Sequence, residues 1–424
     1  MGNLDYTQVL NKIENTRRFG NEPGVVVTAQ VIKVLREKGK QKRIIPYIHV
    51  AGTNGKGSVC AFFSSILKKE HMRVGTFVSP HLVDFEERIT VDGRMIPKED
   101  VTRLGNYLLD IDFGIGLTMF DYCLAMALLY FEEQQCDYMV IETGLGGRLD
   151  STNAIGTPQC AVITKIGYDH MAILGSDIAD IAAEKAGIIK ENGTVVVEQQ
   201  DKRAMQVIEQ EAQKKHARII TVEQSDIARC SGYALRLCGT FQWENAAAAE
   251  LAARYVLGKR YGGPEYEMQN DKTEPKREGT DLNKRIKSAL EEAVWPGRME
   301  IVSKEPFLLV DGAHNSNGVD ALKESLMQMY PGEKFCFFMG VMADKDYDVM
   351  IREILPLAEE FYTVTPDSDR ALQASHLADF IRKEGVEATE LSGVDEIRRH
   401  LKRNTKNVAF GSLYFIGEIK QHRI

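Results

Sequence analysis

Short runs of β-branched and apolar residues alternate along most of the chain with segments of helical periodicity. The runs that we interpret as strands lie at 43–52, 74–79, 137–143 and 160–166. The helical patterns lie at 58–70, 98–110, 118–133, 178–187 and 201–215. The strand runs are apolar at consecutive positions, which is typical of strands buried on both faces of a parallel sheet. The alternation therefore predicts a doubly wound α/β sheet that binds ligands at the carboxyl ends of its strands.

A glycine-rich segment, GTNGKGS (52–58), lies directly after the first strand run and directly before a helical pattern. Glycines at such a turn let backbone N–H groups point at phosphate oxygens at a helix N-terminus. The spacing differs from the standard GxxxxGK[ST], because a glycine separates the lysine from the serine. We interpret the segment as a P-loop rather than a turn with an incidental lysine. Its predicted ATP-binding residues are Asn54, Gly55, Lys56, Gly57 and Ser58.

The composition changes at 259–284, a polar stretch that carries charges of both signs and contains prolines and glycines. We expect this stretch to be an exposed loop or insertion. A second alternating series follows, with strand runs at 306–311, 334–341, 360–365 and 406–410. At roughly 150 residues per domain, the length of 424 residues allows two to three domains. We predict a P-loop-containing domain over 1–294 and a smaller Rossmann-like α/β domain over 295–424.

The composition excludes several classes of protein. With 44% apolar and 27% charged residues, the chain is not disordered, and its net charge of −8 argues against a general nucleic-acid binder. The N-terminus has no apolar core of signal-peptide length, and the longest apolar stretch, 124–131, is too short to span a membrane. The seven cysteines are scattered with no CxxC pair, which favours free thiols in a reducing compartment. We therefore predict a soluble, cytoplasmic protein that binds neither nucleic acid nor membrane.

Polar residues follow two further strand runs. Glu142 ends the run 137–143, and Asp169 and His170 follow the run 160–166. The carboxyl ends of parallel strands meet at one edge of a sheet, so these side chains should face the same crevice as the P-loop. Phosphoryl transfer uses Mg²⁺ and hard oxygen ligands to neutralise phosphate charge. From the residues alone, Glu142 is either a metal ligand or a capping residue, and a lone histidine such as His170 is more often a structural hydrogen-bonding residue.

Several motifs accompany the P-loop in a fixed order. They are SPHLVDFEERITVDG (79–93), ETGLGGRLDSTN (142–153), ITKIGYDHMAILG (163–175), IAAEKAGIIK (181–190), FQWENAAAA (241–249), WPGRME (295–300), DGAHN (311–315) and GSLYFIGE (411–418). On these motifs the chain resembles the folylpolyglutamate synthase/dihydrofolate synthase family of the Mur ligase superfamily, almost from end to end. The resemblance implies an enzyme that joins a carboxylate to an amine with ATP, through an acyl phosphate.

The resemblance also implies two Mg²⁺ ions. Ser79 and Glu142 would hold one, His170 would help to hold the second, and Ser58 would share in the coordination. From its sequence surroundings alone, Lys185 would be a solvent-exposed lysine on a helix. The resemblance implies instead that it is carbamylated by CO₂, as the equivalent lysine typically is in the family. That reaction requires a neutral amine, and hence a lysine whose pKa is lowered by its surroundings. The predicted catalytic residues are Lys56, His170, Lys185 and His314.

The resemblance also implies which residues bind each of the three substrates, ATP, glutamate and folate. Asn245 would contact the adenine, and Arg298 and Asp311 the phosphates and ribose of the nucleotide. His314 and Ser412 would orient the incoming glutamate. The folate contacts map to Thr118, Phe120, Leu149, Asp150 and Ser151. The segment 18–24 departs from the more common LGLxR form that carries part of the folate or pteroate site, which leaves the pterin substrate open.

The leading hypothesis is a monomeric ligase that uses ATP and Mg²⁺ to add L-glutamate to the γ-carboxylate of a reduced folate or its polyglutamates. The nearest alternative is a bifunctional enzyme that also makes dihydrofolate from dihydropteroate and L-glutamate. A cell-wall Mur ligase would share the P-loop but not the motifs at 79–93, 142–153 and 311–315. A P-loop NTPase that acts as a switch is a more distant alternative, and ATP hydrolysis that needs no carboxylate or amine substrate would favour it.

Overall fold

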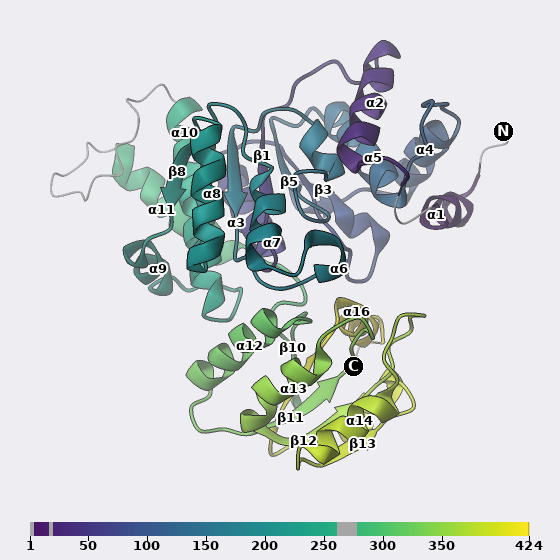
Figure 1. Ribbon diagram of the computed structural model, residues 1–424, viewed down its shortest axis with the longest axis vertical. Helices are drawn as coiled ribbons and strands as arrows, with labels where there is room; N and C mark the ends of the chain where they lie inside the picture. Colours follow the sequence, from purple (N-terminus) through teal and green to yellow (C-terminus); the bar gives the residue numbers. More distant parts are fainter. Residues whose placement is uncertain (1–3, 17–19, 261–277, 423) are drawn as a thin grey trace. The chain divides into compact units, whose positions relative to one another are not determined.

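Two separate sheets organise the chain, one in each of two structural units (Figure 1). The computed structural model describes residues 4–16, 20–260, 278–422 and 424. The first unit comprises Met1–Ala234 and Glu244–Ala293, and the second comprises Leu235–Trp243 and Val294–Ile424. The sequence-based division at 294/295 places Leu235–Trp243 in the first domain, whereas here this stretch joins the second unit. Phe241 packs against the core of that unit, and the Thr240 N–H donates to Ser325 Oγ at 3.0 Å.

The first unit contains an eight-stranded sheet in the order β4-β3-β2-β5-β1-β6-β7-β8. The pairs β2/β3 and β3/β4 are antiparallel, and the other neighbours are parallel. The central strands are fully buried, as expected where helices cover both faces. The strands are β1 (Tyr47–Ala51), β2 (Val74–Phe77), β3 (Ile89–Val91), β4 (Arg94–Met95), β5 (Tyr138–Glu142), β6 (Cys160–Ile163), β7 (Thr194–Val197) and β8 (Arg218–Thr221).

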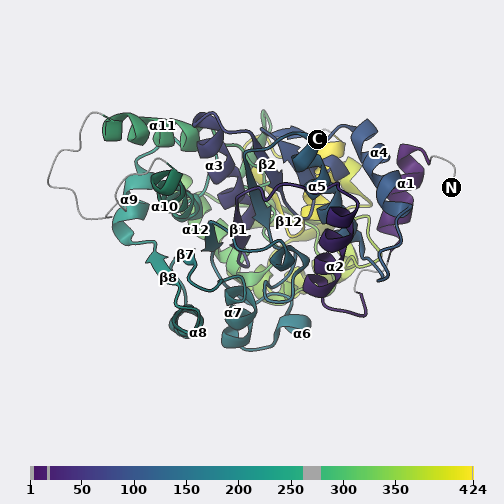
Figure 2. The ribbon, with the colours of Figure 1, turned by 90° about the horizontal axis from the view of Figure 1, so that it is seen from above.

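Helices cover this sheet in two groups that bury separate apolar clusters. One cluster joins α1, α2, α4 and α5 to β2 and β5, and the other joins α7 and α8 to β6 and β7. Figure 2 shows the first group at one side of the unit and α7 and α8 at another. The helices are α1 (Tyr6–Glu14), α2 (Gly24–Glu37), α3 (Lys56–Lys69), α4 (Lys98–Leu109), α5 (Met119–Glu133), α6 (Met171–Leu174), α7 (Ile178–Ala186), α8 (Lys202–Lys214) and α9 (Gln224–Ser231), with the 3-10 turns η1 (Phe85–Arg88) and η2 (Ser151–Ala154).

The stretch predicted as a loop at 259–284 is partly helical. Helix α10 (Phe241–Arg260) runs into its beginning, and α11 (Glu278–Glu292) begins before its end, while 261–277 lie outside the described residues. The α11 sequence places Ile286, Ala289 and Leu290 on one buried face. Helix α11 packs beside α3 (Figure 2), where Arg285 forms an ion pair with Glu70 at 2.6 Å. The loop prediction is therefore wrong at both ends of the stretch, because contacts distant in sequence outweigh its polar composition.

The second unit contains a six-stranded sheet in the order β13-β12-β11-β14-β10-β9, antiparallel only at β9/β10. Its core is rich in phenylalanine, with Phe337 in ring contact with Phe335, Phe361 and Phe410. The strands are β9 (Glu300–Lys304), β10 (Phe307–Val310), β11 (Phe335–Met339), β12 (Ala358–Thr363), β13 (Ala388–Glu390) and β14 (Lys406–Phe410). The helices are α12 (Ser316–Met329), α13 (Tyr347–Ile354), α14 (Ala374–Lys383), α15 (Ile397–His400) and α16 (Leu413–Gln421), with the 3-10 turns η3 (Leu355–Leu357) and η4 (Val394–Glu396).

The predicted fold class is confirmed: both units are α/β, and the P-loop lies in the larger one. The predicted strand runs correspond to β1, β2, β5 and β6 in the first sheet and to β10, β11, β12 and β14 in the second. The antiparallel edges at β3/β4 and β9 were not predicted. In the described part of the chain, no helix is long and apolar enough to cross a bilayer.

Candidate active site

The segment GTNGKGS forms a tight connection between β1 and α3. Gly52 and Gly55 have φ values of +156° and +91°, which residues with a Cβ atom rarely adopt. A Cβ on Gly55 would lie 2.3 Å from Asn245 Oδ1, so the buried Asn245 at the start of α10 lies directly against the loop. The loop leads straight into α3 at Lys56. The first N–H groups of this helix have no intrahelical acceptor and are suited to bind phosphate oxygens.

Lys56 and Glu142 meet beside this loop. Lys56 Nζ lies 3.2 Å from the carbonyl oxygens of Gly52 and Thr53, and 3.8 Å from Glu142 Oε1. Glu142 is buried at the end of β5, where it aligns with Val50 of the neighbouring β1. A carboxylate and the P-loop lysine therefore share one edge of the sheet, as the strand pattern predicted.

The surroundings of Glu142 fit a magnesium ion. The Ser79 N–H donates to Glu142 Oε2 at 3.2 Å, which holds the segment after β2 against this carboxylate. Ser58 is buried in the first turn of α3. Carboxylate and hydroxyl oxygens are donors that Mg²⁺ accepts. Within the described residues, no three His, Cys, Asp or Glu side chains gather in metal-binding geometry. A metal ion held by Glu142 would therefore complete its coordination with hydroxyl groups, water and phosphate.

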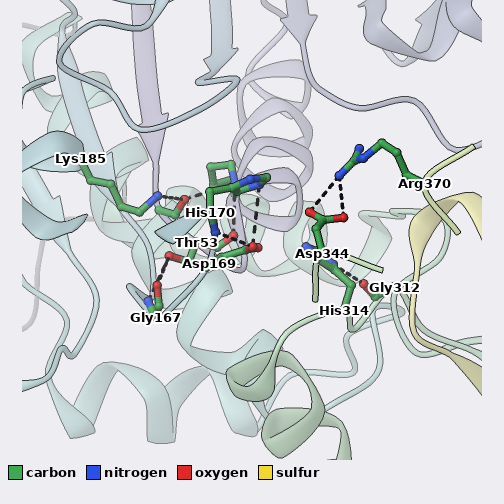
Figure 3. A network of polar contacts seen from close by, with 11 residues as sticks. Thr53, Gly167, Asp169, His170, Lys185, Gly312, His314, Asp344 and Arg370 are labelled. Atoms are coloured by element: carbon green, nitrogen blue, oxygen red, sulfur yellow. Dashed lines mark hydrogen bonds and ion pairs between the residues drawn. The ribbon is translucent and has the colours of Figure 1, made fainter. Parts of the chain in front are cut away.

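Lys185 of α7 reaches the same loop. Its side chain is buried, and Nζ donates to the Gly52 carbonyl at 2.8 Å (Figure 3). Burial and, to a smaller extent, the positive charge of Lys56 lower the pKa of Lys185 to about 7, although Asp169 and Asp150 oppose this shift. The solvated lysine suggested by the residues alone is therefore wrong. The position offers an amine that is partly neutral near pH 7.

Asp169 and His170 lie after β6, on the P-loop side of the sheet. His170 caps the short helix α6 with a φ of +52°, and its Nε2 lies 3.9 Å from Asp169 Oδ1. The two side chains lie close together in Figure 3, near the contact between Thr53 Oγ1 and the Gly167 carbonyl. The His170 side chain is 37% exposed and the Asp169 side chain only 8%. The imidazole is thus accessible for a ligand, and the carboxylate is the better shielded of the two.

The residues expected to bind folate surround the loop between β5 and η2. Phe120 packs against Phe77 with ring centroids 5.5 Å apart, and a Cβ on Gly144 would lie 2.7 Å from its ring. Leu149 is 42% exposed, whereas Asp150 and Ser151 are buried. Asp150 accepts hydrogen bonds from the N–H groups of Gly144 and Leu145 at 3.0 and 2.9 Å. In this structure Asp150 therefore shapes the loop that follows Glu142, while Leu149 is open to solvent.

Asp121 is a residue that the sequence reasoning missed. This buried carboxylate on α5 accepts the Ser151 hydroxyl at 2.6 Å and the Thr28 hydroxyl at 3.3 Å on Oδ1. It also accepts the Thr118 N–H and hydroxyl at 2.8 and 2.6 Å on Oδ2. Thr118 and Ser151 are thus held by one group. The T-x-x-D spacing of a capping box at 118–121 could have identified it.

The predicted site residues of the second unit gather at the carboxyl end of β10. Asp311 is buried and accepts the N–H groups of Met299 and Ala313, each at 2.8 Å. Burial raises the pKa of Asp311 above its ordinary value, although the positive charge of the nearby Arg298 partly opposes this. A Cβ on Gly312 would lie 2.1 Å from Arg298 Nη1, so Arg298 covers this backbone.

His314 and Ser412 are both held by backbone groups in the second unit. His314 Nδ1 donates to the Gly312 carbonyl at 2.8 Å (Figure 3), and Ser412 Oγ accepts the Tyr414 N–H at 3.1 Å as the N-cap of α16. A carbonyl oxygen can only accept, so His314 Nδ1 carries the proton in this contact. An ion pair that the sequence did not reveal joins Asp344 to Arg370 through two contacts of 2.9 Å, also seen in Figure 3.

Comparisons with known proteins identify the family of this chain. Residues 50–253 match the Mur ligase middle domain, and residues 297–409 match the Mur ligase glutamate ligase domain. The dihydrofolate synthase/folylpolyglutamate synthase of Bacillus subtilis is 33% identical over 98% of this chain and 98% of its own length. The chain belongs to the dihydrofolate synthase/folylpolyglutamate synthase family.

Solved structures of this family share its fold with the present chain. The folylpolyglutamate synthase of Mycobacterium tuberculosis complexed with ADP has a TM-score of 0.83 at 25% identity, and the alignment covers 99% of this chain and 98% of that one. The FolC protein of E. coli in complex with DHPP and ADP has a TM-score of 0.80 at 26% identity, with 99% and 97% covered. Members of the family thus bind adenine nucleotides on this fold.

Proposed function

We propose that this protein is an ATP-dependent ligase that joins L-glutamate to the γ-carboxylate of a reduced folate or of its polyglutamates. The observation that carries the proposal is the Lys56–Glu142 pair beside the loop GTNGKGS, in a chain that aligns with a folate enzyme of Bacillus subtilis over nearly its whole length. This pair provides the lysine and carboxylate that phosphoryl transfer requires at a P-loop.

In the proposed reaction, an oxygen of the folate γ-carboxylate attacks the γ-phosphorus of ATP, the bond to ADP breaks, and an acyl phosphate forms. The α-amine of L-glutamate then attacks the acyl carbon, phosphate leaves, and the nitrogen loses a proton to give an amide. Lys56 and the first N–H groups of α3 stabilise the charge of the transferring phosphoryl group. No protein side chain needs to form a covalent intermediate.

The proposed metal ligands are those implied by the family resemblance. Glu142 and Ser79 would hold one Mg²⁺ with Ser58, and the accessible His170 would help to hold a second. When bound, Mg²⁺ neutralises negative charge on the phosphate oxygens of ATP. In the first unit, Asn245 would contact the adenine, and its position against the P-loop at Gly55 supports a role in nucleotide binding.

We propose the remaining substrate contacts from the same family resemblance. Arg298 and Asp311 would bind the nucleotide, and His314 and Ser412 the incoming glutamate, with support from their grouping around the end of β10 and the start of α16. Thr118, Phe120, Leu149, Asp150 and Ser151 would bind the folate. The alignment covers 98% of the Bacillus subtilis relative. We propose a cytoplasmic monomer that acts on small molecules and needs no macromolecular partner.

The name of the Bacillus subtilis relative, which covers both activities, favours a second activity, the synthesis of dihydrofolate from dihydropteroate. The test is product formation with ATP, Mg²⁺ and labelled L-glutamate, run in parallel on a reduced folate and on dihydropteroate. Label in both products is expected for a bifunctional enzyme, and label in the folate alone for a dedicated polyglutamate synthase. ATP turnover without label in either product would contradict the proposed function.

We further propose that Lys185 is carbamylated. The neutral amine attacks CO₂, a C–N bond forms, and one proton is released to solvent, which leaves an anionic carbamate. A pKa of about 7 makes this reaction possible near neutral pH, and the Nζ position beside Gly52 would place the carbamate at the P-loop.

Incubation with ¹³C-bicarbonate should give a protein carbamate signal in the carbon NMR spectrum. Its intensity should rise between pH 6 and pH 8, because the neutral fraction of Lys185 grows as the pH passes its pKa of about 7. Lys185→Arg should abolish the signal. The matched control is Lys190→Arg, because Lys190 also has a burial-lowered pKa but binds the Asn153 carbonyl. A signal that survives in Lys185→Arg would refute the assignment.

A further inference from the structure

Two polar side chains that follow β7 bind the backbone that follows β6. Glu198 is buried, and its Oε2 accepts the Lys165 N–H at 2.8 Å. Gln200 spans the neighbouring peptides, because its Oε1 accepts the Ile166 N–H at 2.9 Å and its Nε2 donates to the Thr164 carbonyl at 3.0 Å. The backbone pairing of β6 with β7 ends at Ile163 and Val197, and beyond that point these side chains provide hydrogen bonds to the backbone of 164–166. The backbone of 164–166 is therefore fixed from the β7 side.

The same backbone supports the P-loop from its other side. The Lys165 carbonyl accepts the N–H groups of Thr53 and Asn54 at 2.9 and 3.2 Å. Thr164 Oγ1 donates to the Asn54 carbonyl at 2.7 Å. With these two N–H groups committed to Lys165, the N–H groups at the start of α3 remain for phosphate. A shift of the Lys165 carbonyl would therefore change the shape of the loop.

We propose that Glu198 and Gln200 are positioning residues that set the affinity for adenine nucleotide, because they fix the Lys165 peptide against which the P-loop folds. Neither residue needs to touch the nucleotide. The inference rests on the proposed use of ATP, but not on which folate is the substrate.

Glutamine is the conservative replacement for Glu198. Burial and the nearby Glu244 raise the pKa of Glu198 well above its ordinary value, with a smaller opposing effect of Lys165. Its second oxygen, Oε1, has no hydrogen-bond partner among the described residues. A glutamine amide keeps a side-chain oxygen that can accept the Lys165 N–H. Glu198→Gln should therefore keep the hydrogen bond to Lys165, whereas Glu198→Leu removes it.

The test is calorimetric titration of the full chain with ADP and Mg²⁺, accompanied by KM values for each substrate. Glu198→Leu removes one hydrogen bond and Gln200→Leu removes two. We expect each variant to weaken ADP binding about tenfold or more, since about 1.4 kcal/mol corresponds to a tenfold change in affinity. The KM for ATP should rise similarly, and the KM values for glutamate and folate should stay within about twofold of wild type. Glu198→Gln should retain wild-type affinity. Gln206→Leu, an exposed change of the same type on α8, is the matched control.

Unchanged ADP affinity in a folded Glu198→Leu protein would overturn the proposal, as would an equal rise in all three KM values. Loss of affinity in Glu198→Gln would also overturn it, because the acceptor is retained there. If Glu198→Leu does not fold, the only partly buried Gln200 decides the question through Gln200→Leu. Calorimetry measures ADP binding without any ligase reaction. The test of Glu198 and Gln200 can therefore be interpreted even if the protein does not add glutamate to a folate.

Discussion

Replacing Lys56 with alanine is expected to lower kcat for glutamate incorporation about a thousandfold, the usual cost of losing a preorganised charge at a transition state. The Lys56 ammonium lies within 3.2 Å of two loop carbonyls and 3.8 Å from Glu142. Alanine removes this charge, which the proposed mechanism uses to stabilise the transferring phosphoryl group. The variant should also raise the pKa of Lys185, because the charge of Lys56 contributes to lowering it. The carbamate signal at pH 7 should then weaken.

The measurement is steady-state turnover with labelled glutamate, together with a thermal melt to establish that the variant is folded. Lys68→Ala is the matched control, since Lys68 lies exposed on the same helix and binds the Asp92 carbonyl. Its turnover should equal that of wild type. A Lys56→Ala enzyme that keeps a tenth or more of wild-type kcat would contradict the role given to this lysine.

Replacing Glu142 with glutamine is expected to lower kcat about a hundredfold and to raise the Mg²⁺ concentration needed for half-maximal rate at least tenfold. A neutral amide is a far weaker ligand for Mg²⁺ than a carboxylate. The amide oxygen can still accept the Ser79 N–H, so the segment after β2 should stay in place. The loss should therefore be specific to the metal dependence.

A titration of initial rate against Mg²⁺ measures this effect. The comparison variant is Glu70→Gln, which neutralises another well-shielded carboxylate of the same unit, paired with Arg285 at 2.6 Å. It should lower the melting temperature but leave the Mg²⁺ dependence unchanged. Equal Mg²⁺ dependence in Glu142→Gln and wild type would exclude this residue as a ligand.

Elements with a strong local pattern could be predicted from the sequence, and those that depend on distant contacts could not. The strand β1, the P-loop and α3 follow one another without interruption, and each carries its own signal. The edge strand β4 spans only Arg94–Met95, too short for periodicity to reveal. Helix α11 was hidden by its polar composition, because the face that packs on α3 becomes visible only when residues 215 positions apart, Glu70 and Arg285, are brought together.

The candidate site shows the same division. Motifs located Lys56 and Glu142 correctly at one sheet edge. Lys185 looked like a surface lysine from its helix alone, and only the fold reveals its burial beside Gly52. Glu198 and Gln200 directly follow β7 in the stretch EQQ (198–200), and no spacing of residue types there distinguishes them. Their contacts arise because two parallel strands separate at their carboxyl ends, which a linear pattern does not encode.

The two glycines of the P-loop with positive φ limit how this family can diverge. A Cβ would lie 1.8 Å from Thr164 Oγ1 at Gly52 and 2.3 Å from Asn245 Oδ1 at Gly55, in addition to the unfavourable backbone angles. Gly114 also has a positive φ, of +68°, but a Cβ there would meet only open space. Random mutagenesis under selection for activity should therefore accept asparagine at Gly114 and almost nothing at Gly52 or Gly55.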